Sequence, residues 1–305
     1  MSTGGQVRSS LLFTGELLRL LDLFDGQAIP ALPFKGPVLA DLLYGDIAAR
    51  EYCDLDILLP KQDIGRGIAA LLAAGYSTDL PTDAGHRKAY LRARYEIHFT
   101  SPGGGIAIEI HQSFLPPAYA FGFNPRWERR TFFDREIFGL APADLFILLC
   151  AHGAKHAWSE PALARDLARL ADLFGGQICW PELLRDAASI GARHMVLLGV
   201  CLAAQLGARF PGDILRQCRN DGPVMGLAAR AGRDGREGPR FFIRTRERMR
   251  DKLVCCARLA LTPNEEDYAF LPLPDMLRPL YYPIHALRVA GKYSLSSLRN
   301  SSLGS

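Results

Sequence analysis

The first 115 residues of the chain alternate between helical and strand patterns of apolar and polar positions. Apolar residues recur with helical spacing in three segments: 10–25, 38–44 and 61–74. Alternation typical of strands is found in three others: 53–59, 95–100 and 106–111. The last two strands are joined by Ser-Pro-Gly-Gly-Gly, a hairpin sequence. This part of the chain therefore predicts a small mixed β-sheet with helices packed on it.

The pattern changes after Phe138. Five segments with helical periodicity follow, with few strand signals between them: 142–157, 161–174, 181–188, 193–208 and 223–232. The sequence LPLPDMLRPLYYPIHALRV predicts an extended, Pro-rich segment packed on the body. We therefore expect an α+β protein, in which a small mixed-sheet domain spans residues 1–138 and a mostly helical domain spans residues 139–305.

Composition narrows the class of protein. The 305 residues are 49% apolar and 22% charged, with a net charge of +4, which excludes wholesale disorder and does not indicate a dedicated DNA binder. The seven cysteines include no C-x-x-C pair, so we expect reduced thiols and a cytoplasmic protein. The longest apolar run, Met195 to Ala208, is 14 residues and too short to span a bilayer. We expect no integral membrane contact and no N-terminal signal peptide.

Carboxylates on the predicted strands are the first sign of chemistry. Asp54 and Asp56 are two residues apart on a strand, so both side chains project from the same face. Glu109 lies in another apolar strand, which can place it beside the aspartates if the two strands are neighbours. Oxygen ligands of this kind suit Mg²⁺ or Mn²⁺, usually together with substrate phosphates. The three acids therefore predict a clamp for two divalent ions.

Cations and a glycine near these acids point to a phosphate ligand. Gly36 precedes a predicted helix, whose first N–H groups can approach a phosphate closely. Lys35 and Arg50 are cations suited to pair with triphosphate oxygens. Pro37 removes one of the N–H groups at the start of the helix. These features predict a ligand that carries phosphates, such as a triphosphate, beside the acidic strand.

Taken in order, these motifs resemble the DNA polymerase β-like nucleotidyltransferase superfamily: Phe34-Lys35-Gly36, Asp54-Leu55-Asp56 and Ile108-Glu109-Ile110. More narrowly, the chain is similar to a family of uncharacterised nucleotidyltransferases. The segments that carry this resemblance are LPFKGPVLADLLYGD, AAREYCDLDILLP, ALLAAGY, IEIHQSF and LFILLCAHGAKHAW. The resemblance covers about residues 30–175. The chain departs from the superfamily in having Pro37, where Gly or Ser is usual, and a longer interval between Gly36 and Asp54.

The resemblance implies a reaction and a role for each residue. An acceptor attacks the α-phosphorus of a metal-bound NTP, and pyrophosphate leaves. Asp54 and Asp56 would hold the metal ions, and Glu109 would hold the catalytic one. Lys35 and Arg50 would steady the β- and γ-phosphates. The sequence does not identify the acceptor. The resemblance suggests an intermediate of peptide or polysaccharide biosynthesis, a protein or a tRNA. The alternative is a non-catalytic nucleotide- or peptide-binding partner in a biosynthetic complex.

The histidines allow more than one interpretation. His111 either contacts the nucleotide or forms a hydrogen bond within the sheet. His152 and His156 lie four residues apart on one predicted helix face, next to Lys155. We favour a structural or nucleotide-adjacent role for this group, with Asp166 as a partner, over a zinc site, since Gly153 replaces the glutamate of a metalloprotease motif. His86 and His98 carry no strong signal.

One segment is strongly basic. Residues 229–252 hold eight Arg and one Lys against four acidic residues. The segment is either a solvated loop and helix face or a docking site for an anionic acceptor or nucleic acid. Phe241 and Phe242 lie among the arginines, a pattern that favours stacking on nucleic-acid bases.

Overall fold

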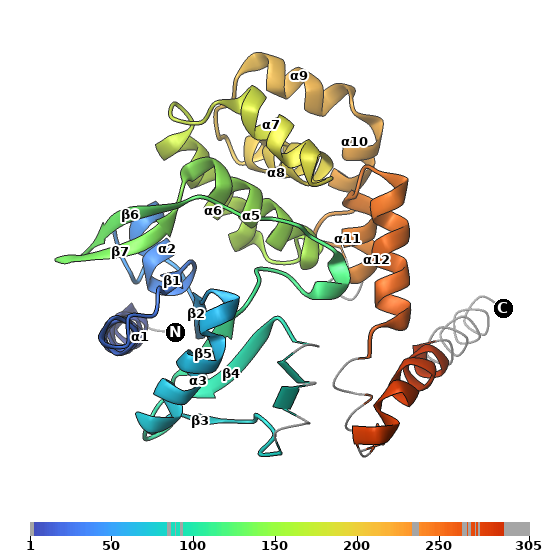
Figure 1. Cartoon of the computed structure of the whole chain (residues 1–305). Helices are drawn as coiled ribbons and strands as arrows, with labels where there is room; N and C mark the ends of the chain where they lie inside the picture. The colour runs from blue at the N-terminus through green and yellow to red at the C-terminus, as the bar shows by residue number, and fades with distance from the viewer. Residues whose placement is uncertain are drawn as a thin grey trace.

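A β-sheet from the first half of the chain lies below a stack of helices from the second half, as seen in Figure 1. The computed structural model describes the following residues: 3–83, 87, 88, 90, 91, 94–233, 238–263, 267, 270, 271, 273 and 275–289. His86 and residues 234–237 of the basic segment lie outside them. The fold is α+β, as the sequence predicts.

The main sheet has five strands. In spatial order they are β1 (Leu32–Pro33), β2 (Asp54–Leu58), β5 (Ala107–His111), β4 (Glu96–Thr100) and β3 (Ser77–Thr78). Strands β2 and β5 pair in parallel, and the other neighbours are antiparallel. The predicted hairpin of residues 95–111 is confirmed as β4 and β5. The parallel pair makes the acidic strand and the Glu109 strand direct neighbours.

One face of this sheet is apolar and buried. It carries Leu55 and Ile57 of β2 and Ile108 and Ile110 of β5, all at most 1% exposed. These side chains pack with residues of α1 (Thr3–Gly26) and α3 (Ile64–Ala73) in one hydrophobic cluster. Because successive side chains of a strand point to opposite faces, the acidic residues must project from the other face.

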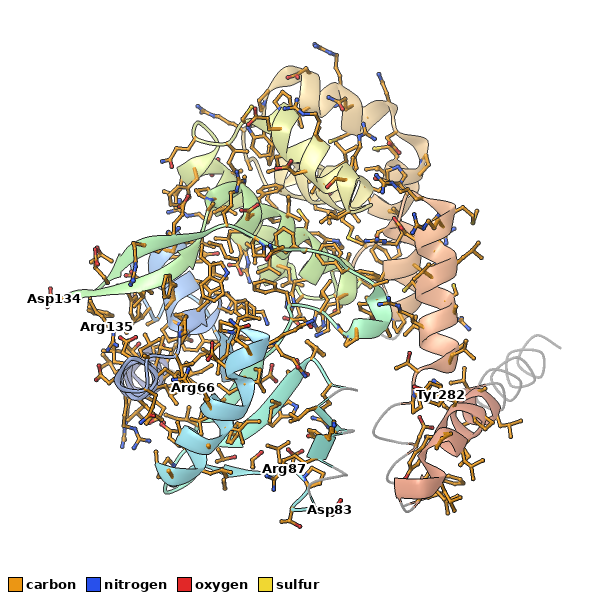
Figure 2. The ribbon with its side chains drawn as sticks, in the orientation of Figure 1. Arg66, Asp83, Arg87, Asp134, Arg135 and Tyr282 are labelled. Carbon is orange, nitrogen blue, oxygen red and sulfur yellow. The ribbon has the colours of Figure 1, made fainter. Side chains whose placement is uncertain are left out.

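A second, two-stranded sheet was not predicted. Strands β6 (Trp127–Phe132) and β7 (Arg135–Leu140) form a hairpin whose end extends past α1. Phe132 and Ile137 join the cluster beneath the main sheet. Figure 2 shows Asp134 at the tip of the hairpin, and Arg135 donates hydrogen bonds to Asp22 and Asp25 of α1. Position 138, where we placed the domain boundary, lies within β7.

Helices make up the rest of the described chain. They are α2 (Gly36–Tyr44), α5 (Pro142–Lys155), α6 (Pro161–Phe174), α7 (Trp180–Ser189), α8 (Arg193–Gln205), α9 (Gly212–Asn220), α10 (Gly222–Ala228), α11 (Gly238–Thr245) and α12 (Met249–Leu261). All five helices predicted after Phe138 are confirmed, whereas α9, α11 and α12 were not predicted. A second hydrophobic cluster joins Phe34, Leu39 and Leu43 to the buried faces of α5 and α8.

The C-terminal prediction was wrong. Residues 275–280 form a 3₁₀ helix and residues 281–289 are helical rather than extended. Pro283 lies in the first turn of the latter helix, where a missing N–H costs no hydrogen bond. Nδ1 of His285 in this helix donates a hydrogen bond of 2.6 Å to Oδ2 of Asp267, which ties the helix to the segment before it. In the described part of the chain, no helix has both the length and the apolar character of a membrane span.

Candidate active site

The acidic residues of the two central strands lie side by side. Asp56 of β2 is the register partner of Glu109 of β5, and Glu109 is in turn the register partner of His98 of β4. Asp54 is two residues before Asp56 and therefore on the same face. The structure thus brings together the three carboxylates that the sequence singled out. It also adds His98, to which we had assigned no role.

Lys35 neutralises the deepest of these carboxylates. Its Nζ donates a hydrogen bond of 2.7 Å to Oδ1 of Asp56, which is 3% exposed. Burial alone would raise the pKa of Asp56, but the nearby Lys35 ammonium and His111 hold that pKa well below its usual range. Burial likewise opposes the charge on Lys35, yet Asp56 keeps the pKa of the lysine above its ordinary value. Both groups are therefore charged in the folded protein.

His111 is held between two acids. Its Nε2 lies 3.0 Å from Oδ1 of Asp56 and 3.4 Å from Oε2 of Glu109. Burial would lower the pKa of His111, but its hydrogen bonds to these carboxylates raise that pKa above the ordinary value. Of the two environments predicted for His111, the structure shows the hydrogen bond within the sheet. Its Nδ1 is buried and has no hydrogen-bond partner in the described structure.

Asp54 is the least compensated of the three acids. Burial, together with repulsion from Asp56 and Glu109, raises the pKa of Asp54 to about 6. Its Oδ2 lies 3.7 Å from the thiol of Cys53. A carboxylate in this state gains more than its neighbours from an added cation, because nothing nearby fully neutralises it.

Helix α2 begins beside the acidic strand. Lys35 is its N-cap, and Gly36 has the left-handed φ of +57°. A Cβ at position 36 would lie 3.4 Å from the backbone oxygen of Asp54, an ordinary van der Waals contact, so it is the left-handed φ that favours glycine there. The helix predicted after Gly36 is confirmed, and its N-terminus lies next to Asp54.

Arg50 has a different environment from the one expected. Its Nε donates a hydrogen bond of 2.8 Å to Oδ2 of Asp166 on α6, and Tyr44 donates one of 2.8 Å to Oδ1 of the same carboxylate. Asp166 thus accepts hydrogen bonds from Arg50 and Tyr44, whereas we had expected it to be a partner of the histidines of α5. Arg50 also lines a cavity of about 310 Å³ next to Cys53.

The end of α5 supplies the other cation. Lys155 donates a hydrogen bond to the hydroxyl of Tyr95, and its Nζ lies 4.8 Å from the centre of that ring. Burial lowers the pKa of Lys155, while the nearby Glu96 opposes that change. Burial also lowers the pKa of His152, and that of His156 to about 4. In the described part of the chain these two histidines belong to no group of three or more side chains that could hold a metal ion.

The basic segment contributes no aromatic stacking surface. Phe241 and Phe242 are at most 1% exposed, and Phe242 stacks on Tyr119 with the ring centres 4.1 Å apart. Both rings belong to the hydrophobic core, so the interleaving with arginines reflects helix periodicity rather than a nucleic-acid surface. This part of the prediction was wrong.

The donor set fits a divalent ion. One ligand atom each from Asp56, Glu109 and His111 lies within 4.8 Å of the other two, and Asp54 lies beside them on β2. Carboxylate oxygens are suitable ligands for Mg²⁺ or Mn²⁺, and Nε2 of His111 already contacts two of these carboxylates. The raised pKa of Asp54 reflects burial and repulsion from Asp56 and Glu109, and a bound cation would relieve that repulsion.

Comparison with known proteins agrees with this geometry. A family profile described as "Uncharacterised nucleotidyltransferase" matches residues 2–208, about two thirds of the chain, and extends through the sheet as far as the end of α8. No curated protein and no solved structure matches the chain at a significant level. The chain belongs to this nucleotidyltransferase family and is, on that basis, a transferase.

Proposed function

We propose that the protein transfers a nucleoside monophosphate from an NTP to an acceptor, in a reaction that depends on Mg²⁺ or Mn²⁺ and releases pyrophosphate. One observation supports this proposal above all. Three carboxylates on adjacent parallel strands share a face with Lys35, directly beside the N-terminus of α2. A metal-bound triphosphate needs both kinds of group, acids for the cations and N–H or ammonium groups for the phosphates.

Asp54, Asp56 and Glu109 are the residues that would hold the divalent ions. When bound, the ions supply positive charge that offsets the charge developing on the phosphates during transfer. The protein contributes their placement, since the register of β2 and β5 fixes Asp56 opposite Glu109. His111 keeps both carboxylates in position through its two short contacts.

The phosphates would lie on the Lys35 side of this face. Lys35 and the first N–H groups of α2 can bind the β- and γ-phosphates, and Lys155 can approach from the end of α5. We keep Arg50 in the nucleotide site as well, because it lines the cavity beside Cys53 while Asp166 holds its Nε. The seven cysteines are all free, which supports our proposal of a reducing, cytoplasmic location.

The first test is label transfer from each α-³²P-labelled NTP, with Mg²⁺ or Mn²⁺ and a lysate of the source cell as acceptor. We expect wild type to label an acceptor and Asp56→Asn or Glu109→Gln to lower the rate by at least about 100-fold. Glu128→Gln, which changes an exposed acid on β6, is the matched control and should retain the full rate. Nucleotide binding without any label transfer would support the binding-partner alternative instead.

A further inference from the structure

Two neighbouring strands of the sheet carry the same tripeptide. Strand β4 contains Glu96-Ile97-His98 and β5 contains Glu109-Ile110-His111. The strands are antiparallel, and their register places Glu96 opposite His111 and His98 opposite Glu109. Each glutamate therefore faces a histidine of the other strand. All four side chains lie on the face that carries Asp56.

Glu109 lies at the centre of this arrangement. Its Oε2 is 3.4 Å from Nε2 of His111, whereas its Oε1 is 3.6 Å from Nδ1 of His98. The two oxygens of one carboxylate thus face two different histidines. On the other side of the His98 ring, Oε1 of Glu96 lies 4.0 Å from Nε2 of His98. A carboxylate whose two oxygens each face a different histidine is arranged like a ligand that bridges two cations.

The group formed by Glu96, His98 and Glu109 differs from the group of Asp56, Glu109 and His111 in its exposure to solvent and in its charge. One ligand atom each from Glu96, His98 and Glu109 lies within 4.8 Å of the other two, and all three residues are partly exposed. Four carboxylates share this face, because Glu96 joins the three acids already described, and the lysines beside them are Lys35 and Lys155. The acids therefore outnumber the lysines on this face, although His111, whose pKa is raised, offsets part of the excess negative charge.

We propose that Glu96, His98 and Glu109 form a second divalent-cation position, with Glu109 bridging it to the ion held by Asp54 and Asp56. Two carboxylates with an imidazole favour Mn²⁺ or Zn²⁺ over Mg²⁺. The position lies on the side of Glu109 that is away from Lys35 and α2. Its role in transfer rests on the proposed function: there it would bind the acceptor, because the phosphates occupy the Lys35 side.

Manganese binding without nucleotide tests this position directly. We would titrate the metal-free protein with Mn²⁺ and count bound ions by electron paramagnetic resonance. The variants are Glu96→Gln/His98→Ala and, as the matched control on the same strand and face, Thr100→Ala. We expect wild type and the control to bind one ion more than the double variant. Nitrogen coupling from His98 should disappear from the spectrum of the double variant.

The outcomes separate the two proposals. Equal numbers of bound ions in wild type and the double variant would overturn the second position, whether or not transfer occurs. A second ion that depends on Glu96 and His98 would support it even if no NTP gave label transfer, and only the proposed function would then fail. If the double variant does not fold, the near-isosteric Glu96→Gln alone should weaken the second ion by about tenfold or more, and unchanged affinity would overturn the proposal.

Discussion

Arg50 and Asp166 form a buried ion pair of 2.8 Å across 116 residues of sequence. Their side chains are 14% and 1% exposed, and Tyr44 binds the second oxygen of Asp166. The pair joins α6 to the segment that leads from α2 into the acidic strand. The position of that strand therefore depends on a helix that the sequence assigns to the other half of the chain.

Removing Asp166 should be costly for stability. Asp166→Ala leaves the Arg50 guanidinium buried without its partner, a change that typically costs about 3–5 kcal/mol. Urea unfolding would measure this loss. As control, Glu182→Gln breaks the exposed pair with Arg185 and should change stability by at most about 1 kcal/mol. Similar losses for the two variants would contradict the structural importance of the Arg50–Asp166 pair.

Alanine substitutions at two glycines would separate the effect of backbone strain from the effect of a new contact with the acidic strand. Gly36→Ala and Gly45→Ala both place alanine at a left-handed φ, +57° and +67°, which costs about 1–2 kcal/mol each. Only at position 36 does the new Cβ contact another strand, at the ordinary van der Waals distance of 3.4 Å from the backbone oxygen of Asp54, whereas position 45 faces open space. We expect both variants to unfold at lower urea concentration and only Gly36→Ala to lose nucleotide affinity, measured by calorimetry. Equal affinities would show that α2 does not need its close contact with the strand.

Asp54 should make the metal-free protein less stable at neutral pH than in mild acid. Burial and the neighbouring acids raise its pKa to about 6, above the unfolded value of about 3.9, so the folded state holds the proton more tightly. This stabilisation is complete below the unfolded pKa and is lost as pH rises through about 6. In a chelator, Asp54→Asn should therefore raise the melting temperature by a few degrees at pH 7.5 and by much less at pH 4.5. An equal effect at both pH values would refute the raised pKa.

The β6–β7 hairpin offers a contrast between adjacent residues. Phe132 is 1% exposed and lies in the cluster beneath the main sheet, whereas Phe133 at the turn is 54% exposed. We expect Phe132→Ala to cost about 3–5 kcal/mol and Phe133→Ala less than about 1 kcal/mol. Thermal unfolding of the two variants would check this. A large loss for Phe133→Ala alone would mean that the strands are shifted by one residue.

Much of the candidate site could be predicted because its signals are local. An acidic pair within an apolar strand defines a face by itself, and Gly36 marks the start of a helix without reference to anything distant. The pairing of strands could not be obtained in this way. The contact between His98 and Glu109 depends on the register of β4 on β5, although the repeated Glu-Ile-His was a signal that could have suggested it.

The sequence failed where distant contacts decide the structure. The ion pair of Arg50 with Asp166 on α6 could not be predicted, because 116 residues of sequence separate the two side chains. Strand β6 was missed because its charged residues, Glu128, Arg129 and Arg130, hide the alternation that Phe132 and the paired strand β7 complete. Phe241 and Phe242 appeared accessible for the same reason: only packing on Tyr119 shows that they are buried.

The hydrophobic cluster shared by α2, α5 and α8 has a consequence for any attempt to divide the protein. A cut between Asp134 and Ala141 would expose Phe34, Leu39 and Leu43 on one fragment and the apolar faces of α5 and α8 on the other. Each fragment alone would expose an apolar surface to water and would aggregate through it. Produced together in one cell, the two fragments would bind each other through these apolar surfaces. The protein could then be used as a split reporter, in which two separate fragments assemble into the folded protein.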